Sequence, residues 1–277
     1  MYKNKYFPAC FTVLLILCCS LSVTVAGQEN ALATAITGSN RTPSNVERDQ
    51  HRHPQQTLEF FGIKPDMTVV EVLPGRGWYT EILAPYLAEQ GKLIAASYGA
   101  DNERDYLSGI HAGYMEILAA DAEVYGKIEV VDFKTPTGYM DDIADASVDM
   151  VLDFRNTHNL IRWYGGADEA YQHYYRILKP GGVLGIIEHR AHPGTDAMQT
   201  ANTGYVPEQY SIDAATRAGF ELVAKSEINA NPRDTKDHPN GVWTLPPRQR
   251  WGNDDPAKYM AIGESDRMTL KLIKPVQ

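Results

Sequence analysis

The clearest clue to the fold is the segment Thr68–Leu87, which reads TVVEVLPGRGWYTEILAPYL. A run of β-branched apolar residues ends at a carboxylate, Glu71, and two glycines, Gly75 and Gly77, precede a helical pattern. A strand, a tight glycine turn and a helix N-terminus in this order bring the backbone of doubly wound α/β proteins close to a nucleotide-like ligand. Glycine suits such a turn because it has no Cβ to obstruct the approach and adopts positive φ at little cost.

Strand-like and helix-like segments alternate along the rest of the chain. We predict strands over residues 68–72, 92–98, 127–133, 148–153, 183–188, 220–228 and 268–274. We predict helices over residues 45–61, 78–89, 103–119, 167–178 and 208–218. This alternation is typical of a mostly parallel sheet covered by helices, so the sequence predicts an α/β protein with a doubly wound, seven-stranded sheet.

Length and charge narrow the classes of function. A chain of 277 residues with 43% hydrophobic residues is long enough for one large domain with a substantial core. Its formal net charge of −9 disfavours binding to nucleic acid or to an anionic membrane surface. We therefore expect a small-molecule ligand and no nucleic acid, and the sequence leaves the oligomeric state open.

The N-terminus has the layout of a secretory signal peptide. Lys3 and Lys5 precede an apolar run over residues 11–26, and small residues at its end allow cleavage before Gly27. The run is shorter than the ~20 residues of a membrane-spanning helix, so we expect no stable membrane insertion after cleavage. Residues 1–26 are thus predicted to be a signal peptide and the mature protein to be periplasmic or secreted. All three cysteines lie in this segment, so the mature chain has no disulfide and no thiolate ligand.

Two further segments stand outside the alternation. Residues 27–44 are small and polar without a periodic pattern, which indicates a flexible leader before a single domain over residues 45–277. Residues 229–266 hold several prolines and two tryptophans between the last two predicted strands. Leaving those aromatic side chains in water is costly, so we expect an ordered insertion that shapes a ligand pocket.

Three segments resemble class I S-adenosylmethionine-dependent methyltransferases. They are VVEVLPGRG at the glycine turn, VDMVLDF at the fourth strand and YRILKPGGVLGIIE at the fifth. The resemblance covers residues 45–228 and the last ten residues. It implies a Rossmann-like methyltransferase fold with a late antiparallel strand, and methyl transfer from S-adenosylmethionine to a small molecule. The segments GWYTEILAPYL, VWTLPP and AIGESDRM are similar to a group of exported methyltransferases of undefined substrate.

The resemblance also implies a cofactor site at the ends of the first three strands. The residues it assigns to S-adenosylmethionine are Glu71 for the amino-acid end, Gly75 and Gly77 for the passing backbone, Trp78 for the pocket wall, Asp101 or else Ser97 for the ribose, and Asp132 for the adenine.

Two positions depart from the pattern of that family, and both fall at the cofactor site. Leu73 stands where the family usually has the first glycine of the turn, and the second strand ends at Tyr98 without the acid that holds the ribose. These differences favour an alternative function, in which an exported protein keeps the fold but binds a small ligand without catalysis. Export favours the same alternative, because S-adenosylmethionine is made in the cytoplasm.

Polar residues follow the fourth predicted strand in the segment DFRNTHN, residues 153–159. The carboxyl ends of the strands form the edge where such folds bind ligands. Methyl transfer to an alcohol or phenol requires alignment of the reactants and removal of a proton. We predict His158 as the general base, with Asp153 and Asn156 as supporting catalytic residues.

A metal-dependent hydrolase is the remaining alternative. His158, His189, His192 and Asp153 would meet at one crevice, and histidines with a carboxylate are a common zinc ligand set. The chain has no His-Glu-x-x-His motif or similarly compact spacing, so we assign no metal site.

Overall fold

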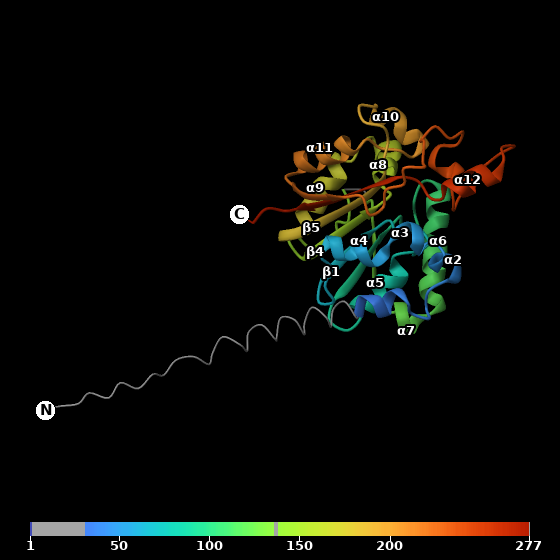
Figure 1. The fold of residues 1–277 in the computed structure, drawn as a ribbon. Coiled ribbons are helices and arrows are strands. Elements are labelled where there is room, and N and C mark those ends of the chain that lie inside the picture. Colours follow the sequence, from blue (N-terminus) through green and yellow to red (C-terminus); the bar gives the residue numbers. More distant parts are fainter. Residues whose placement is uncertain (2–30, 136–137, 277) are drawn as a thin grey trace.

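The computed structural model describes residues 1, 31–135 and 138–276, and a seven-stranded sheet forms its centre (Figure 1). The strands are β1 Thr68–Val72, β2 Lys92–Ser97, β3 Glu129–Asp132, β4 Val148–Phe154, β5 Leu178–His189, β6 Glu221–Ser226 and β7 Arg267–Ile273. Their order in the sheet is β3-β2-β1-β4-β5-β7-β6. Neighbouring strands are parallel except at β7, which is antiparallel to both β5 and β6. The predicted fold class, with its late antiparallel strand, is confirmed.

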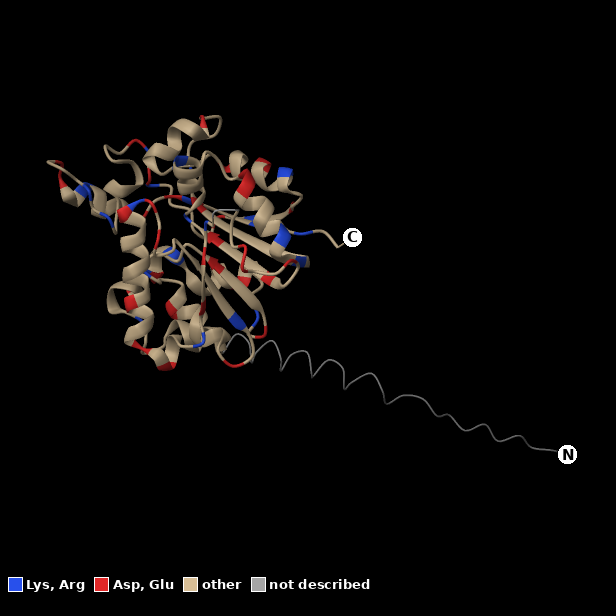
Figure 2. Ribbon diagram, turned by 180° about the vertical axis from the view of Figure 1, so that it is seen from behind, with Lys and Arg blue, Asp and Glu red and all other residues tan. Residues whose placement is uncertain are grey.

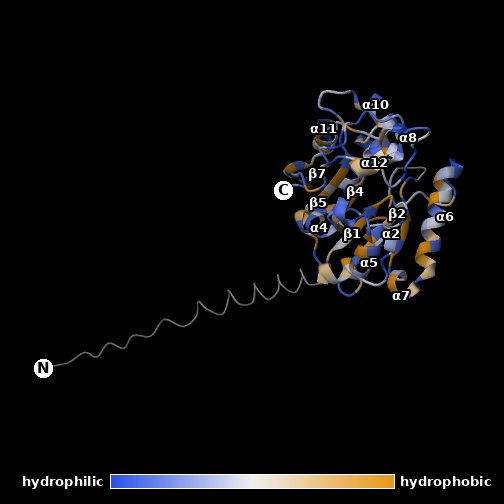
Figure 3. Cartoon of the chain, turned by 45° about the vertical axis from the view of Figure 1, so that its right-hand side comes forward, coloured by the Kyte–Doolittle hydropathy of each residue, from blue (hydrophilic) through white to orange (hydrophobic). Residues whose placement is uncertain are grey.

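Helices cover both faces of the sheet. Successive strand residues point to opposite faces, so Val69 joins one hydrophobic cluster and Val70 the other. The Val69 face packs against α4 (Pro54–Phe61), α5 (Thr80–Leu87), α6 (Asp105–Ala120) and α7 (Ala122–Tyr125), and the Val70 face against α9 (Asp168–Ile177) and α11 (Glu208–Ala218). Hydrophobic residues accordingly concentrate on the central strands (Figure 3). Among the described residues, none of these helices has the length and hydrophobicity of a membrane span.

The predicted bounds agree best where a local pattern decides them. β1 and α11 begin and end at the predicted residues. β5 is longer than predicted because residues 178–182 join it. Leu178 pairs with Val148, and the backbone N–H of Gly181 donates to the carbonyl of Lys274 at 2.7 Å. Contacts to distant strands therefore extend β5 into the predicted turn.

The helix predicted over residues 45–61 is interrupted. It consists of α2 (Pro43–Val46), α3 (Asp49–Arg52) and α4, and His53 between the last two has a φ of 42°. The residue before a proline is disfavoured in the right-handed helical region, so the His53–Pro54 step ends one helix and starts another.

The structure differs from the predicted flexible leader at residues 31–44, which pack against the domain. Residues 31–36 are helical, and Leu32 and Ala35 are buried in the cluster on the Val69 face. Arg41 is also buried and forms ion pairs with Asp49 at 2.9 Å and Glu81 at 3.3 Å. These contacts tie the segment to α3 and α5. The remainder of the predicted leader, and the signal peptide beyond Met1, lie outside the described residues.

The insertion between β6 and β7 is ordered against the domain. It contains η2 (Gly241–Thr244) and α12 (Pro256–Ile262), and α12 lies at the same end of the sheet as α8 (Thr157–Tyr164) and α10 (Ala197–Thr200) (Figure 1). Asp234 of the insertion is buried and accepts a hydrogen bond from the hydroxyl of Tyr205 at 2.9 Å. The short helix η1 (Ala201–Thr203) packs against η2.

Candidate functional site

A cavity of about 640 Å³ lies at the carboxyl ends of β1, β4 and β5. Ligands of open α/β sheets bind at this edge. The predicted site residues that line it are Gly75, Trp78, Asn156 and His158. The predicted site residues that do not line it are Glu71, Gly77, Asp101, Asp132 and Asp153.

The two glycines of the turn have different roles. Both have positive φ, 63° at Gly75 and 73° at Gly77. A Cβ built on Gly75 meets no atom within 4 Å, so this glycine leaves open space where its backbone borders the cavity. A Cβ on Gly77 would lie 3.5 Å from the side chain of Thr80, inside the protein. Gly75 thus leaves space in which a ligand can lie against the backbone, and Gly77 allows the backbone conformation of the turn.

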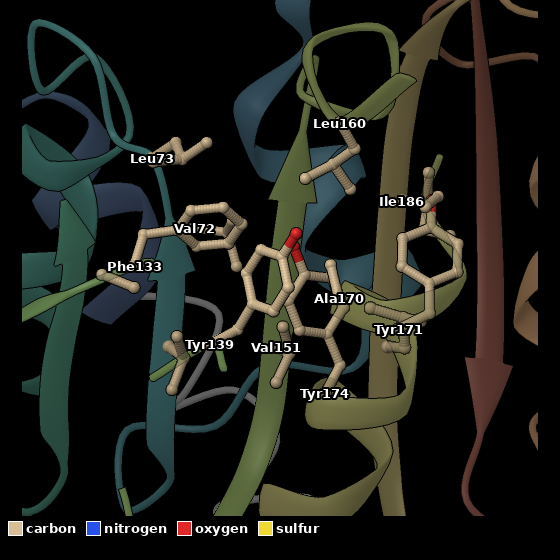
Figure 4. Close-up of a cluster of buried hydrophobic side chains, with 14 of the residues drawn as sticks. Val72, Leu73, Phe133, Tyr139, Val151, Leu160, Ala170, Tyr171, Tyr174 and Ile186 are labelled. Carbon is tan, nitrogen blue, oxygen red and sulfur yellow. The ribbon is translucent and has the colours of Figure 1, made fainter. Parts of the chain in front are cut away.

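Leu73 adopts the positive φ of the turn, although it is not the expected glycine. Its φ is 46°, in the left-handed region that costs an ordinary residue about 1–2 kcal/mol. The side chain is buried at the edge of the hydrophobic cluster on the Val70 face (Figure 4), and burial of a leucine is worth about 1.5–3 kcal/mol. Its backbone N–H donates to the carbonyl of Ala96 at 2.8 Å. The departure at this position therefore leaves the backbone conformation of the turn intact.

Glu71 lies beneath the turn and does not face the cavity. The hydroxyl of Thr80 donates to its carboxylate at 2.6 Å and lies 3.3 Å from the hydroxyl of Tyr114. Burial raises the pKa of Glu71 to about 7, although the Thr80 hydrogen bond opposes the shift. The resemblance implied that Glu71 contacts the cofactor directly or through water, and this arrangement does not support the direct contact.

Glu71→Gln tests this burial, because glutamine keeps an acceptor for Thr80 but does not ionise. The folded pKa lies above that of an unfolded glutamate, so native stability falls as the pH rises from about 4.5 to about 7. Relative to the native protein, the free energy of unfolding of Glu71→Gln should increase by about 2 kcal/mol between pH 5 and pH 8. Chemical denaturation at both pH values, with the exposed Glu123→Gln as control, measures this difference. An equal difference at both values would contradict the buried, raised pKa.

Trp78 anchors the N-terminal segment at the rim of the cavity. Its indole N–H donates to the carbonyl of Asn45 at 2.9 Å. The guanidinium groups of Arg41 and Arg52 lie 5.1 and 4.6 Å from its ring centroid. Trp78 therefore combines the predicted position in the pocket wall with a packing role.

The acids predicted to hold the ribose and the adenine do not reach the cavity. Asp101 and Asp132 are both exposed, and Asp132 lies against Gly99, where an added Cβ would be 2.8 Å from its carboxylate. Ser97, the alternative for the ribose, lies 3.0 Å from a ring nitrogen of His111. The cavity wall beyond β2 is formed by Tyr98 together with residues of α6.

His158 lies in the first turn of α8, a helix that the sequence analysis missed. The backbone N–H of His158 donates to the carboxylate of Glu188 at 2.9 Å. A carboxylate at a helix N-terminus satisfies a free N–H and interacts favourably with the helix dipole. Glu188, near the end of β5, thus fixes the start of α8 and the position of the histidine.

The ring of His158 is oriented by the same carboxylate. Its Nδ1 lies 3.1 Å from both oxygens of Glu188, so Nδ1 carries the proton and donates. Nε2 makes no hydrogen bond among the described residues, and the side chain lines the cavity. A carboxylate that holds one imidazole nitrogen while the other faces the reactant is the arrangement of a general base.

The two residues predicted to support His158 lie in different surroundings. Asn156 is buried at the cavity and its amide donates to the carbonyl of Val72 at 2.9 Å, which joins the ends of β1 and β4. Asp153 is fully buried away from the cavity, and burial together with the nearby charge of Glu188 raises its pKa to about 8. The structure brings Asn156 to the site and leaves Asp153 beneath it.

Of the four residues considered as metal ligands, only His158 and His189 lie in one cluster, together with Glu188. Ligand atoms of His158, Glu188 and His189 lie within 4.8 Å of one another. His192 is exposed and outside this cluster, as is Asp153. Burial, with the electrostatic influence of the neighbouring His158 and Arg155, lowers the pKa of His189 well below its usual value, and its Nδ1 lies 2.5 Å from the hydroxyl of Ser265.

The carboxylate of Glu188 is already engaged in this cluster. Besides the ring of His158, it accepts hydrogen bonds from the backbone N–H groups of His158 and His189 at 2.9 and 2.7 Å. These bonds favour Glu188 as the partner of a base over Glu188 as a metal ligand.

Sequence reasoning missed Glu188 and the arginines of the cavity. Six arginines line the cavity against one carboxylate, Glu264. Glu188 carried one usable signal, since it stands at the end of a predicted strand, where parallel sheets bind ligands. The arginines come from separate segments without a common spacing.

Comparison with curated proteins finds methyltransferases. No protein-family model matches the chain. The ubiquinone/menaquinone biosynthesis C-methyltransferase UbiE of Legionella pneumophila (strain Lens) is 25% identical over 138 residues, which cover 50% of this chain and 49% of that protein. The ribosomal RNA small subunit methyltransferase H of Pseudoalteromonas atlantica is 23% identical over 166 residues and 53% of each chain. The chain therefore spans about half the length of the curated relatives it matches.

Solved structures match over most of the chain. A methyltransferase from Aquifex aeolicus, described as dependent on S-adenosylmethionine, has a TM-score of 0.53 and 18% identity, covering 84% of this chain and 94% of that one. The [4+2]-cyclase SpnF has a TM-score of 0.56 and 14% identity over 92% and 96% of the two chains. Geranyl diphosphate C-methyltransferase of Streptomyces coelicolor A3(2), solved with S-adenosylhomocysteine, has a TM-score of 0.53 and 13% identity over 83% and 81%. At these identities the likeness establishes the fold, which is that of class I S-adenosylmethionine-dependent methyltransferases.

Proposed function

We propose that this protein transfers a methyl group from S-adenosylmethionine to a small molecule bound in the cavity. One observation carries the proposal: the open turn at Gly75 and the His158–Glu188 pair border the same cavity. The fold is that of methyltransferases, and both curated relatives described above are named as such. The open space over Gly75 fits the passage of a ligand along the backbone.

His158 acts through Nε2 in this mechanism. An acceptor hydroxyl or amine within hydrogen-bond reach gives its proton to Nε2, while Glu188 holds the ring and balances the imidazolium charge. S-adenosylmethionine, when bound, supplies a methyl group on a sulfonium sulfur that keeps the carbon–sulfur electron pair. The backbone at Gly75 and the ring of Tyr98 would hold the cofactor, and Asn156 fixes the strand ends beneath it.

Gly75→Asn tests the cofactor site with the fold preserved. Asparagine tolerates positive φ better than other side chains, and its amide would project into the open space of the cavity. Calorimetric titration should show that the variant binds S-adenosylmethionine and S-adenosylhomocysteine about tenfold more weakly or worse.

The matched control is Gly252→Asn. Gly252 has a φ of 62°, an added Cβ there also meets no atom within 4 Å, and the residue does not line the cavity. Its variant should bind both compounds like the native protein. Equal affinity for both compounds in Gly75→Asn and Gly252→Asn would remove the turn from the cofactor site.

A binding protein without catalysis is the second candidate function. It is favoured by the position of Tyr98 at the cavity, where an acid for the ribose was expected, and by the exposure of Asp101. Binding of S-adenosylhomocysteine by the native protein, together with methyl transfer to a small-molecule extract, would exclude this candidate. Absence of both in the folded protein would favour it.

We further propose that residues 1–26 are removed as a signal peptide and that the mature protein is periplasmic or secreted. The support is the lysine-flanked apolar run that ends in small residues before Gly27. N-terminal sequencing of the protein from its native cells should begin near Gly27. An intact N-terminus would overturn the proposal.

A further inference from the structure

The cavity is strongly basic although the protein is acidic. Its lining contains one carboxylate, Glu264, and the six arginines Arg48, Arg76, Arg155, Arg162, Arg248 and Arg250. The chain as a whole has a formal net charge of −9. Acidic and basic residues are both spread over the outer helices (Figure 2). The excess of positive over negative side chains is therefore a property of the cavity and not of the whole protein.

The single carboxylate is already shared by several arginines. Glu264 lies 2.7 Å from Arg48, 3.1 Å from Arg52 and 2.7 Å from Arg267. Guanidinium nitrogens of all three remain buried without a hydrogen-bond partner among the described residues. Burial and the charge of Arg48 lower the pKa of Arg155, beside this group, to about 10. Glu264 therefore does not neutralise the positive charge of the cavity.

The other five cavity arginines form no ion pair with a carboxylate among the described residues, although Glu264 interacts with Arg155 over a longer distance. Arg155 is half-buried, and the other four are exposed at the cavity. They come from four places in the fold: the β1 turn, the end of β4, α8 and the insertion. Arg162 lies 4.9 Å from the ring centroid of Trp243, which holds its side chain beside the insertion. Unpaired guanidinium groups that converge from separate elements form a site for an anion with several oxygens.

We propose that the molecule methylated in this cavity carries a phosphate or diphosphate group. This inference rests on the proposed methyl transfer. The carboxylate of S-adenosylmethionine would balance one guanidinium group, and several remain for the acceptor. Guanidinium forks match phosphate oxygens in bidentate pairs. Trp163, Trp243 and Pro247 add an apolar wall for the body of the acceptor.

Inorganic diphosphate is the probe for this site. Calorimetric titration of the native protein, with S-adenosylhomocysteine present, should show diphosphate binding that weakens as the salt concentration rises. Arg248 and Arg250 are exposed on the insertion, so Arg248→Gln with Arg250→Gln should leave the fold intact and weaken diphosphate binding about tenfold. The control is Arg217→Gln, an exposed arginine of α11 outside the cavity, which should bind diphosphate like the native protein.

The outcomes separate the anion site from the methyl transfer. Failure of the folded protein to bind diphosphate, or equal binding by the double variant and Arg217→Gln, would overturn the phosphorylated acceptor. Loss of diphosphate binding when S-adenosylhomocysteine is added would also overturn it, because the arginines would then serve the cofactor. Diphosphate binding without any S-adenosylhomocysteine binding would instead contradict the proposed function and leave an anion-binding cavity. Tenfold weaker diphosphate binding with unchanged S-adenosylhomocysteine affinity in the double variant is the supporting result.

Discussion

Replacing His158 by alanine is expected to lower the rate of methyl transfer by about 10²–10⁴-fold, the usual contribution of a positioned general base. The imidazole is held by Glu188 at 3.1 Å and belongs to α8, whereas the glycine turn proposed to hold the cofactor follows β1. The affinity for S-adenosylhomocysteine should therefore remain unchanged. Transfer of a labelled methyl group to a small-molecule extract measures the rate, and calorimetric titration measures the affinity.

His192→Ala is the matched control for this substitution. His192 follows β5 closely, is exposed and does not line the cavity, so its loss should change neither the rate nor the affinity. Unchanged methyl transfer by His158→Ala would reduce His158 to a structural residue of α8. Loss of both transfer and binding would place it in the cofactor site instead.

Glu188 acts through the histidine as a positioning residue. The backbone N–H groups of His158 and His189 donate to different oxygens of Glu188, so glutamine in its place keeps an acceptor for only one of them, and its amide can turn a donor toward Nδ1. The ring would then carry its proton on Nε2, which removes the base from the reactant side. Glu188→Gln should therefore lower kcat while KM for the acceptor and the affinity for S-adenosylhomocysteine stay close to native values.

Local sequence patterns predicted most of the fold because they report on local backbone and burial. The bounds of β1 follow from its apolar run and the glycines after it, and those of α11 from the glycine that ends it. The length of β5 was missed since its first residues are held by Val148 and Lys274, far along the chain. The break at His53 carried a readable signal in the proline that follows.

The candidate site could be predicted only where one segment supplies it. His158 and Asn156 stand just after β4, and the position of a strand end was enough to select them. Glu188 was missed because it closes an apolar strand, and only the parallel pairing of β4 with β5 brings it to α8. Asp101 was selected by its distance along the sequence, but its side chain is exposed outside the cavity.

The arginines of the cavity could not be predicted from the sequence, because no single segment supplies them. Arg155 and Arg248 are separated by almost the whole second half of the domain, and they meet because the insertion folds over the end of the sheet. Charge counted along the sequence gave an acidic protein, whereas charge counted around the cavity gives a basic site. The proposed ligand class therefore rests on the three-dimensional arrangement and not on the composition of the chain.

Glu264→Gln is expected to lower the free energy of unfolding by about 3–5 kcal/mol, the usual effect of breaking a buried ion pair by removing one partner. Glu264 is 4% exposed and contacts Arg48, Arg52 and Arg267. Glutamine would leave these guanidinium groups without the buried carboxylate that they share, and Arg155 nearby would lose its electrostatic interaction with it. Chemical denaturation at neutral pH measures the loss.

Glu227→Gln is the control, because Glu227 is likewise bonded to an arginine, accepting two hydrogen bonds from Arg190, but its side chain is 68% exposed. Its loss should cost less than about 1 kcal/mol. Unfolding of Glu264→Gln at the same denaturant concentration as Glu227→Gln would contradict the role of the buried carboxylate.

The pH dependence separates charge from packing at Glu264. Burial alone would raise its pKa, but Arg52, Arg267 and Arg48 together hold the pKa well below its usual value. The stabilisation is therefore complete above the pKa of an unfolded glutamate, about 4.3, and is lost as the pH falls toward the folded pKa. The native protein should lose more stability than Glu264→Gln between pH 5 and pH 3, so the two denaturation midpoints should converge. A difference that stays constant over this range would mean that glutamine disturbs the packing around Glu264 and not its charge.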